Sequence, residues 1–299
     1  MIPVVFALLT ALSNGLASVL QRRAAATAPP SKALHLALIG YLIRHKIWLA
    51  GIAMIIVAAV CQAVALANGP VALVQPIFIV ELPFALLLAS RLARRRLPRL
   101  TWLAVALVTI SLGAGLAAAA PSGGTAHAPF PVWAPTLIVT GCFEAVVIAV
   151  ALRARGNGRA ALLGLAAACG YALTAALMKD AMDTLARGIA PFFAAWQLYA
   201  TAAAGIGALF LLQNALQAGT LVAVQPPLTL GDALISVAYG VSVFNENLRS
   251  GGWLAAEIIA VLLIGVGCVE LSRSLAAAQE ASQRHAPSAA PPSAASTEA

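Results

Sequence analysis

The sequence predicts an all-α membrane protein with nine transmembrane helices, arranged as an inverted 4+1+4 repeat. Composition is the first reason: 62% of the 299 residues are hydrophobic and only 9% are charged, whereas a soluble chain carries about 25% charged residues. Apolar stretches of about 20 residues, the length that crosses a bilayer as a helix, recur along the chain. Two of them, at residues 71–90 and 221–239, contain Val-Gln-Pro followed by a single acid.

The nine predicted helices are separated by short segments of basic or turn-forming residues. They cover residues 2–20, 47–67, 71–90, 100–119, 132–152, 160–178, 189–212, 220–243 and 252–271. Arg22 and Arg23 follow the first helix, which is the reverse of a cleavable signal peptide, so we expect this helix to be retained. Asn68-Gly69-Pro70 predicts a tight turn between the second and third helices.

This order of helices divides the chain into four parts. Residues 1–119 form the first repeat, residues 120–152 a linker and the fifth helix, residues 153–272 the second repeat, and residues 273–299 a tail. The tail is rich in Ala, Ser, Pro and Gln and lacks the apolar residues that form a core, so we expect it to be disordered.

The basic residues predict the orientation in the membrane. Fifteen of the 18 Lys and Arg fall on one side of the predicted helices, and the positive-inside rule makes that side cytoplasmic. The N-terminus is then outside and the C-terminus in the cytoplasm of a plasma or inner membrane. The same placement at helix ends accounts for the net charge of +8 without a nucleic-acid partner.

Small residues support the internal repeat, because Gly113-x-Gly115 in the fourth helix returns as Gly265-x-Gly267 in the ninth. A single connecting helix makes the second group of four enter the membrane from the opposite side. Such glycines permit close helix contact. They fit either a homodimer through the fourth and ninth helices or packing within the chain.

Three features suggest a family: Asn14-Gly15 with a basic end at Arg22-Arg23, the Asn68-Gly69-Pro70 turn, and the basic segment before the fourth helix. Over residues 2–272 the chain resembles the drug/metabolite transporter (DMT) superfamily, and within it the bacterial NIPA-like magnesium transporters with nine helices. The resemblance implies secondary transport by alternating access. In the small multidrug members a proton-coupling glutamate lies in helix 1, where this chain has Asn14.

Polar residues within the predicted helices, either near mid-depth or beside the two Gln-Pro kinks, are the candidates for a substrate site. They are Asn14, Gln75, Glu81, Glu144, Tyr171, Gln225 and Asp232. A charge at this depth is costly and usually faces a partner or a cavity. We expect them to line a cavity for a small cation or a polar metabolite, although each acid could instead be a neutral packing element.

Three of these residues, Glu81, Glu144 and Asp232, are the candidate metal ligands. Mg²⁺ takes oxygen ligands and keeps several waters around one or two carboxylates; protonated acids could instead carry H⁺ or select an organic cation. Gln75-Pro76 and Gln225-Pro226 predict kinks that free backbone carbonyls, either lining the cavity or simply bending the helices.

The remaining polar residues point to no catalytic chemistry. Glu257, Lys179 and Glu270 lie near helix ends, where placement at the membrane interface explains them. The sequence holds no Ser-His-Asp set, Walker loop, HExxH or dinucleotide fingerprint, so we expect neither an enzyme nor a cofactor. An intramembrane enzyme, or a non-transporting assembly or lipid-organising protein, is the alternative to a transporter.

Overall fold

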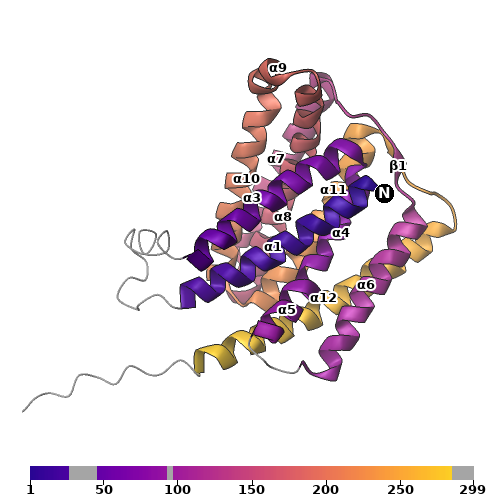
Figure 1. Cartoon of the computed structure of the whole chain (residues 1–299). Helices are drawn as coiled ribbons and strands as arrows, with labels where there is room; N and C mark the ends of the chain where they lie inside the picture. Colours follow the sequence, from indigo (N-terminus) through magenta and orange to yellow (C-terminus); the bar gives the residue numbers. More distant parts are fainter. Residues whose placement is uncertain (27–45, 93–96, 285–299) are drawn as a thin grey trace, which may run out of the picture.

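The computed structural model describes residues 1–26, 46–92 and 97–284 as a bundle of helices (Figure 1). The helices are α1 (Ile2–Ala26), α3 (Lys46–Asn68), α4 (Val71–Ile77), α5 (Glu81–Leu92), α6 (Arg99–Ala119), α7 (Phe130–Arg153), α8 (Gly156–Ala186), α9 (Ile189–Ala194), α10 (Trp196–Ala218), α11 (Leu221–Phe244) and α12 (Trp253–Arg284). The 3-10 helix η2 (Phe78–Val80) joins α4 to α5, and β1 (Ser122–Gly123) pairs antiparallel with β2 (Glu246–Asn247).

The described part of the chain contains nine helical stretches that are long and apolar enough to cross a membrane. Large apolar side chains also cover the outside of the bundle: Ile56, Ile110, Ile206 and Leu262 are each more than half exposed. Such a surface is unfavourable in water and favourable against lipid chains. The protein is therefore a multi-pass integral membrane protein, as the composition predicts.

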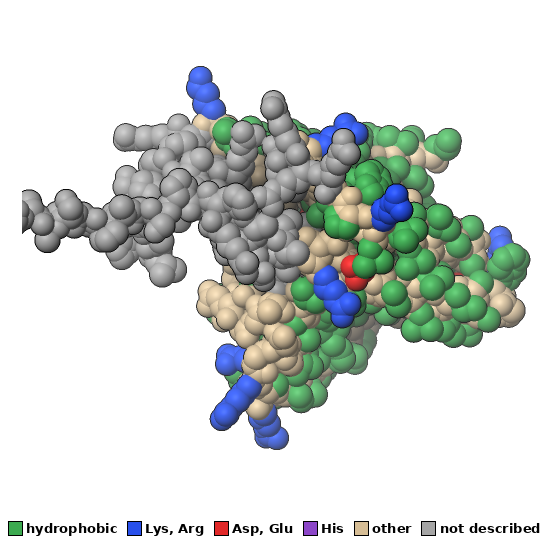
Figure 2. All heavy atoms as spheres, turned by 90° about the horizontal axis from the view of Figure 1, so that it is seen from below, with side chains coloured by type: hydrophobic (Ala, Val, Ile, Leu, Met, Phe, Trp, Pro, Cys, Tyr) green, Lys and Arg blue, Asp and Glu red, His purple; other side chains and the backbone are tan. Residues whose placement is uncertain are grey.

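The bundle has two ends, which we call the ribbon side and the tail side. The ribbon side carries β1, β2 and the first residues of α1 and α4, and the tail side carries the end of α12 and the first residues of α8 and α11 (Figure 1). Figure 2 views the tail side, where Lys and Arg side chains are spread over the face and a small patch of Asp or Glu side-chain atoms is visible among apolar ones.

Helix α8 is the most enclosed of the long helices, because small residues let its neighbours approach closely. Ala166, Ala167 and Ala168 are fully buried. A Cβ added at Gly170 would lie 2.8 Å from the Cβ of Ala208 in α10. One added at Gly164 would lie 2.9 Å from the backbone oxygen of α11 residue Val224. The small-residue face therefore sets the spacing of α8, α10 and α11.

The packing partners of the first four predicted spans recur among the last four. Helix α1 packs against α3, and α8 packs against α10. Helix α1 also contacts α4, η2 and α5, just as α8 contacts α11, while α6 packs against α12 and α4 against α11. The two groups of helices thus meet along the α4–α11 and α6–α12 contacts.

The two Gln-Pro sites differ, although the sequence predicts similar kinks. Pro76 is followed by the 3-10 turn η2 between α4 and α5, whereas Pro226 and Pro227 lie inside the continuous helix α11. The backbone keeps right-handed helical angles at Ile77, Phe78 and Glu81, so what we call the helix break is a change from α-helix to a tighter turn within one span. The residues of η2 are aromatic or β-branched and favour an α-helix less than the two leucines and threonine at residues 228–230.

Several predicted boundaries need correction. The predicted helix at residues 189–212 is divided into α9 and α10 at Ala195, which has an extended backbone. The predicted disorder from residue 273 onward is wrong as far as Arg284, because α12 continues to that residue through an Ala- and Gln-rich segment of high helix propensity. The rest of the predicted tail lies outside the described residues.

Candidate functional site

Three of the predicted site residues lie within electrostatic range of one another inside the bundle. Glu81 is the first residue of α5, directly after the break at η2. Tyr171 of α8 and Asp232 of α11 lie close enough to Glu81, and to each other, for their charges to interact. Ser236, one helical turn after Asp232 and fully buried, lies 3.5 Å from its carboxylate oxygen Oδ1. We call Glu81, Tyr171 and Asp232 the central cluster.

Glu144 belongs to a different group of side chains. It is half-buried in α7 and interacts electrostatically with Cys169 and Tyr239. The Tyr239 hydroxyl forms a 2.7 Å hydrogen bond with Thr140 Oγ1. Glu144 thus shares its depth with the central cluster but faces other neighbours.

The predicted metal ligands Glu81, Glu144 and Asp232 stay a prediction. Among the residues that the structure describes, no three His, Cys, Asp or Glu side chains gather closely enough to hold a metal ion. Glu144, the third predicted ligand, lies with Cys169 and Tyr239 instead. The sequence groups the three acids by their depth in the membrane. Depth does not determine the direction in which a side chain leaves its helix.

The predicted amides lie on the helices around the central cluster. Asn14 is half-buried on α1, next to Gly15, where an added Cβ would lie 3.4 Å from the backbone oxygen of Glu81. Gln225 is half-buried on α11. Gln75 is only 2% exposed, and its side-chain Nε2 has no hydrogen-bond partner among the described atoms. A buried amide donor in this state is costly.

An ion pair near the ribbon side was not predicted from the sequence. The carboxylate of Glu246, the first residue of β2, accepts hydrogen bonds from Val71 N (2.6 Å), Ala72 N (2.9 Å) and Lys179 Nζ (2.6 Å). Its side chain is fully buried, and that of Lys179 is 7% exposed. Lys179 Nζ also lies 4.7 Å from the ring centroid of Phe244. We call Glu246 and Lys179, with the first turn of α4, the ribbon-side latch.

The physical chemistry of the latch explains why two charges are buried there. The first backbone N–H groups of a helix have no partner within it, and the helix dipole favours an anion at that end. Glu246 satisfies two such donors of α4 and neutralises Lys179 as well. The sequence signal is slight, because Lys179 directly follows the predicted helix at residues 160–178, a position that placement at the membrane interface also explains.

A second buried carboxylate, Asp180, fastens the linker to the bundle beside the latch. It is fully buried on α8 and accepts hydrogen bonds from His127 Nδ1 and Trp133 Nε1. Gln197 Nε2 of α10 lies 3.5 Å from it. Asp180 therefore ties the linker, α7 and α8 together on the ribbon side.

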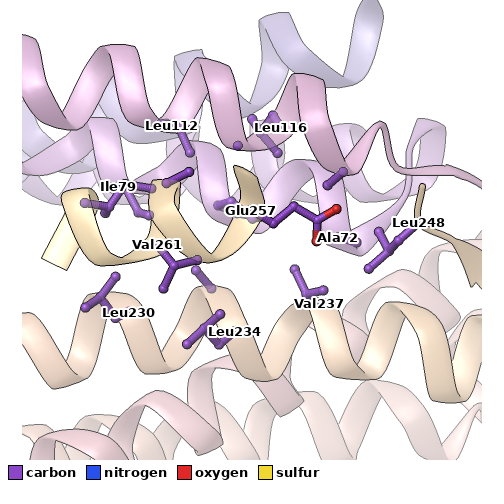
Figure 3. Close-up of a pocket in the computed structure, with 16 residues that line it drawn as sticks. Ala72, Ile79, Leu112, Leu116, Leu230, Leu234, Val237, Leu248, Glu257 and Val261 are labelled. Atoms are coloured by element: carbon purple, nitrogen blue, oxygen red, sulfur yellow. The ribbon is translucent and has the colours of Figure 1, made fainter. Parts of the chain in front are cut away.

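An apolar cleft of about 120 Å³ lies between α4, α6, α11 and α12. Figure 3 shows aliphatic side chains such as Leu112, Leu230 and Val261 around it, with Glu257 of α12 reaching toward Ala72. Glu257 Oε1 is buried and has no hydrogen-bond partner among the described atoms. The cleft extends to Pro76 and Ile79 at the helix break but holds no second charged residue among its lining side chains.

These features define a multi-pass membrane protein with an interior acidic cluster at a broken helix. The chain is 26% identical over 276 residues to an uncharacterized protein of Corynebacterium glutamicum, covering 92% of this chain and 96% of that relative. No protein-family model matches the sequence, and no solved structure matches it. The similarity therefore runs through both groups of helices and carries no assigned activity.

Proposed function

We propose that the protein is a secondary transporter that moves a small cation or a polar, positively charged metabolite by alternating access. The observation that carries this proposal is the central cluster: Glu81 at the break between η2 and α5, beside Tyr171 and Asp232. Acids inside a membrane are costly and typically mark a substrate or ion pathway. Proline-interrupted segments in matching positions of two halves, here at Pro76 and Pro226, are a pointer to the binding site of a secondary transporter.

An inverted 4+1+4 repeat is part of this proposal, and matching contacts in the two groups of helices support it. In the first group, a Cβ added at Gly69, in the turn between α3 and α4, would overlap Pro3 at the start of α1. In the second group, one added at Gly219, between α10 and α11, would lie 2.7 Å from the Cβ of Ala160 near the start of α8. Together with the recurring packing partners, these contacts support a 4+1+4 arrangement, in which rocking of one repeat against the other exposes a shared site.

The ends of the bundle differ in a way that suits one state of such a cycle. On the ribbon side the latch holds β2, α4 and α8 together. On the tail side a cavity of about 600 Å³ is lined among the described residues by Phe84, Ser90, Arg91 and Trp102. If the N-terminus is outside, as we propose, this arrangement fits a state closed to the outside.

The chemistry of the central cluster favours a cation over an anion. Two carboxylates and a phenol supply oxygen ligands of the kind that bind a cation. Mg²⁺ needs only one or two protein carboxylates when it retains water, and an organic ammonium needs one. The buried amide of Gln75, on the same broken helix, offers an additional donor to a polar substrate. Membership of the DMT superfamily is part of this proposal.

Flux into proteoliposomes tests the function directly. Purified protein is reconstituted, and uptake of Mg²⁺, of protons and of a panel of organic ammonium compounds is compared with that of protein-free liposomes. Saturable uptake of one of these cations that is lost in Glu81→Gln supports the proposal. Glu257→Gln is the matched control, because Glu257 is also a carboxylate within the membrane span but lies outside the central cluster. Absence of flux with every cation would favour a non-transporting assembly.

A further inference from the structure

A polar cavity lies on the tail side, away from the central cluster and the latch. It has a volume of about 340 Å³ and is bounded by the loop before α8, the first turn of α8 and the last turn of α10. Four polar side chains line it: Arg155, Arg159, Asn214 and Gln217. None of its lining residues is acidic, so the cavity carries two positive charges and two amides.

Arg159 shows that this is more than a pair of arginines marking a helix end. Its Nε is buried and has no hydrogen-bond partner among the described atoms. An arginine that only sets topology directs its guanidinium into water, whereas Arg159 is half-buried in a cavity with an enclosed donor. A buried donor of a charged group without a partner is costly, and an anion in the cavity would satisfy it.

The backbone around the cavity adds further donors of the same sign. Helix α8 begins at Gly156, and its N-cap residue Arg155 forms no side-chain capping hydrogen bond. The positive end of α8 therefore opens on the cavity, as Gly156 is among the lining residues. On the opposite wall, Asn214 Nδ2 donates to Phe210 O at 2.7 Å, which leaves its other amide hydrogen for a ligand.

The walls are held in place by contacts outside the cavity. Asn157 Oδ1 accepts hydrogen bonds from Thr220 N (3.1 Å) and Thr220 Oγ1 (3.3 Å), which fixes the start of α8 against the start of α11. The corresponding place in the first group, where Gly69 meets Pro3, contains no arginine at the start of α1. The two guanidinium groups are therefore not required by the packing of the repeat.

We propose that this cavity binds a phosphate group at the membrane surface, held by Arg155, Arg159, the amides of Asn214 and Gln217, and the first backbone N–H groups of α8. The arginine fork matches the geometry of phosphate oxygens. Basic pockets between transmembrane helices typically bind the headgroups of anionic lipids. The same chemistry recognises a soluble phosphate, so the source of the group is decided by experiment.

Two arms distinguish the sources. In the first, protein extracted in mild detergent from bilayers of phosphatidylcholine and phosphatidylglycerol is examined by native mass spectrometry for retained phosphatidylglycerol. In the second, protein in phosphatidylcholine nanodiscs is titrated with inorganic phosphate, and its melting temperature is recorded. Arg155→Gln/Arg159→Gln is expected to reduce lipid retention, or phosphate affinity, by roughly tenfold or more.

The matched control is Arg153→Gln, because Arg153 is a neighbouring basic residue in the last turn of α7 that does not line the cavity. Retention lost in the double variant but kept in the control supports a lipid headgroup, and the same pattern with phosphate supports a soluble ligand. Equal losses of lipid retention or phosphate affinity in the double variant and in Arg153→Gln would overturn the proposal, as would the absence of binding in both arms. If the double variant does not yield folded protein, Gln217→Leu, from the exposed end of the other wall, is tested for a several-fold loss.

Discussion

Glu246 and Lys179 form a buried ion pair, with Glu246 Oε1 2.6 Å from Lys179 Nζ, although 67 residues separate them in the chain. The same carboxylate caps the start of α4 through Val71 N and Ala72 N. The Glu246 side chain thus joins three segments: β2, helix α8 through Lys179, and the first turn of α4. In the alternating-access cycle that we propose, opening the ribbon side would separate these groups.

Removing the cation of the latch should destabilise the folded protein. Lys179→Met leaves Glu246 buried beside α4 without its ammonium partner, and the loss of one member of a buried pair costs about 3–5 kcal/mol. We expect a clearly lower melting temperature in detergent. Arg187→Met is the control, since Arg187 and Asp183 form an exposed pair of a kind worth about 0–1 kcal/mol. Equal small shifts in the two variants would show that the latch contributes little.

The space around Glu246 should be as important as its charge. A Cβ added at Gly240 of α11 would overlap Glu246 Oε2 and lie 3.2 Å from the Cβ of Ala72. Gly240→Ala should therefore displace the carboxylate from the start of α4 and lower the melting temperature. In combination with Lys179→Met the two effects should be less than additive, because both act on one network.

Gly207→Ala provides the matched control for this substitution. Gly207 lies in α10 and has nothing within 4 Å of an added Cβ. Alanine there should be neutral or should stabilise the helix by up to about 1 kcal/mol. A melting temperature for Gly240→Ala equal to that of Gly207→Ala would contradict the tight packing of Glu246.

Hydropathy was sufficient to predict the spans but not the groups that connect them. Nine apolar stretches follow from composition and length, and the structure confirms nine membrane-spanning candidates among its described residues. The latch depends on a contact between β2 and α8 that no local pattern encodes, since Glu246 lies just after a helix end like any interfacial acid.

The candidate site shows the same limit in a different form. Residue counting placed Glu81, Glu144 and Asp232 at similar depth, yet the rotation of each helix about its axis decides which acids meet. Glu81 and Asp232 both interact electrostatically with Tyr171, whereas Glu144 interacts with Cys169 and Tyr239. Similarly, Gln-Pro occurs twice in the sequence. Only the residues after Pro76 form a 3-10 turn, whereas α11 continues as an α-helix after Pro226.

The proposed orientation can be tested by labelling single cysteines. With the four native cysteines replaced by alanine, Ser122→Cys in β1 and Gly158→Cys near the start of α8 place thiols on the ribbon side and the tail side. Both positions are exposed. A membrane-impermeant maleimide added to intact cells should label Ser122→Cys, and Gly158→Cys only after the membrane is opened. The reverse pattern would place the N-terminus in the cytoplasm.

The paired glycines should hold α6 and α12 together within one chain. A Cβ added at Gly267 would overlap the stiff side chain of Val108, and one at Gly115 would lie 3.0 Å from the Cβ of Ala260. Gly267→Ala should lower the melting temperature without changing the mass of the particle. Gly113→Ala, with open space around the added Cβ, is the control. A change in particle mass in either variant would support the homodimer instead.

Replacing the acids of the central cluster with their amides separates a substrate site from a scaffold. Glu81→Gln and Asp232→Asn preserve shape and much of the hydrogen bonding while removing the charge. If the carboxylates hold a cation, losing one should reduce transport by roughly 30-fold or more, because a buried charge pair is typically worth at least 2 kcal/mol. Glu144→Gln, outside the cluster, should retain most of the flux.

The decisive comparison sets flux against stability in the same variants. A site residue should lose transport while the melting temperature changes little, since the amide occupies the same space. A scaffold residue should do the opposite: Glu81→Ala would lower the melting temperature, while both amide variants would continue to transport. Because Glu81 and Asp232 come from different groups of helices, equal loss of flux from either single substitution would show that both groups contribute to one binding site. Unimpaired flux in both amide variants would instead favour a carrier of neutral metabolites.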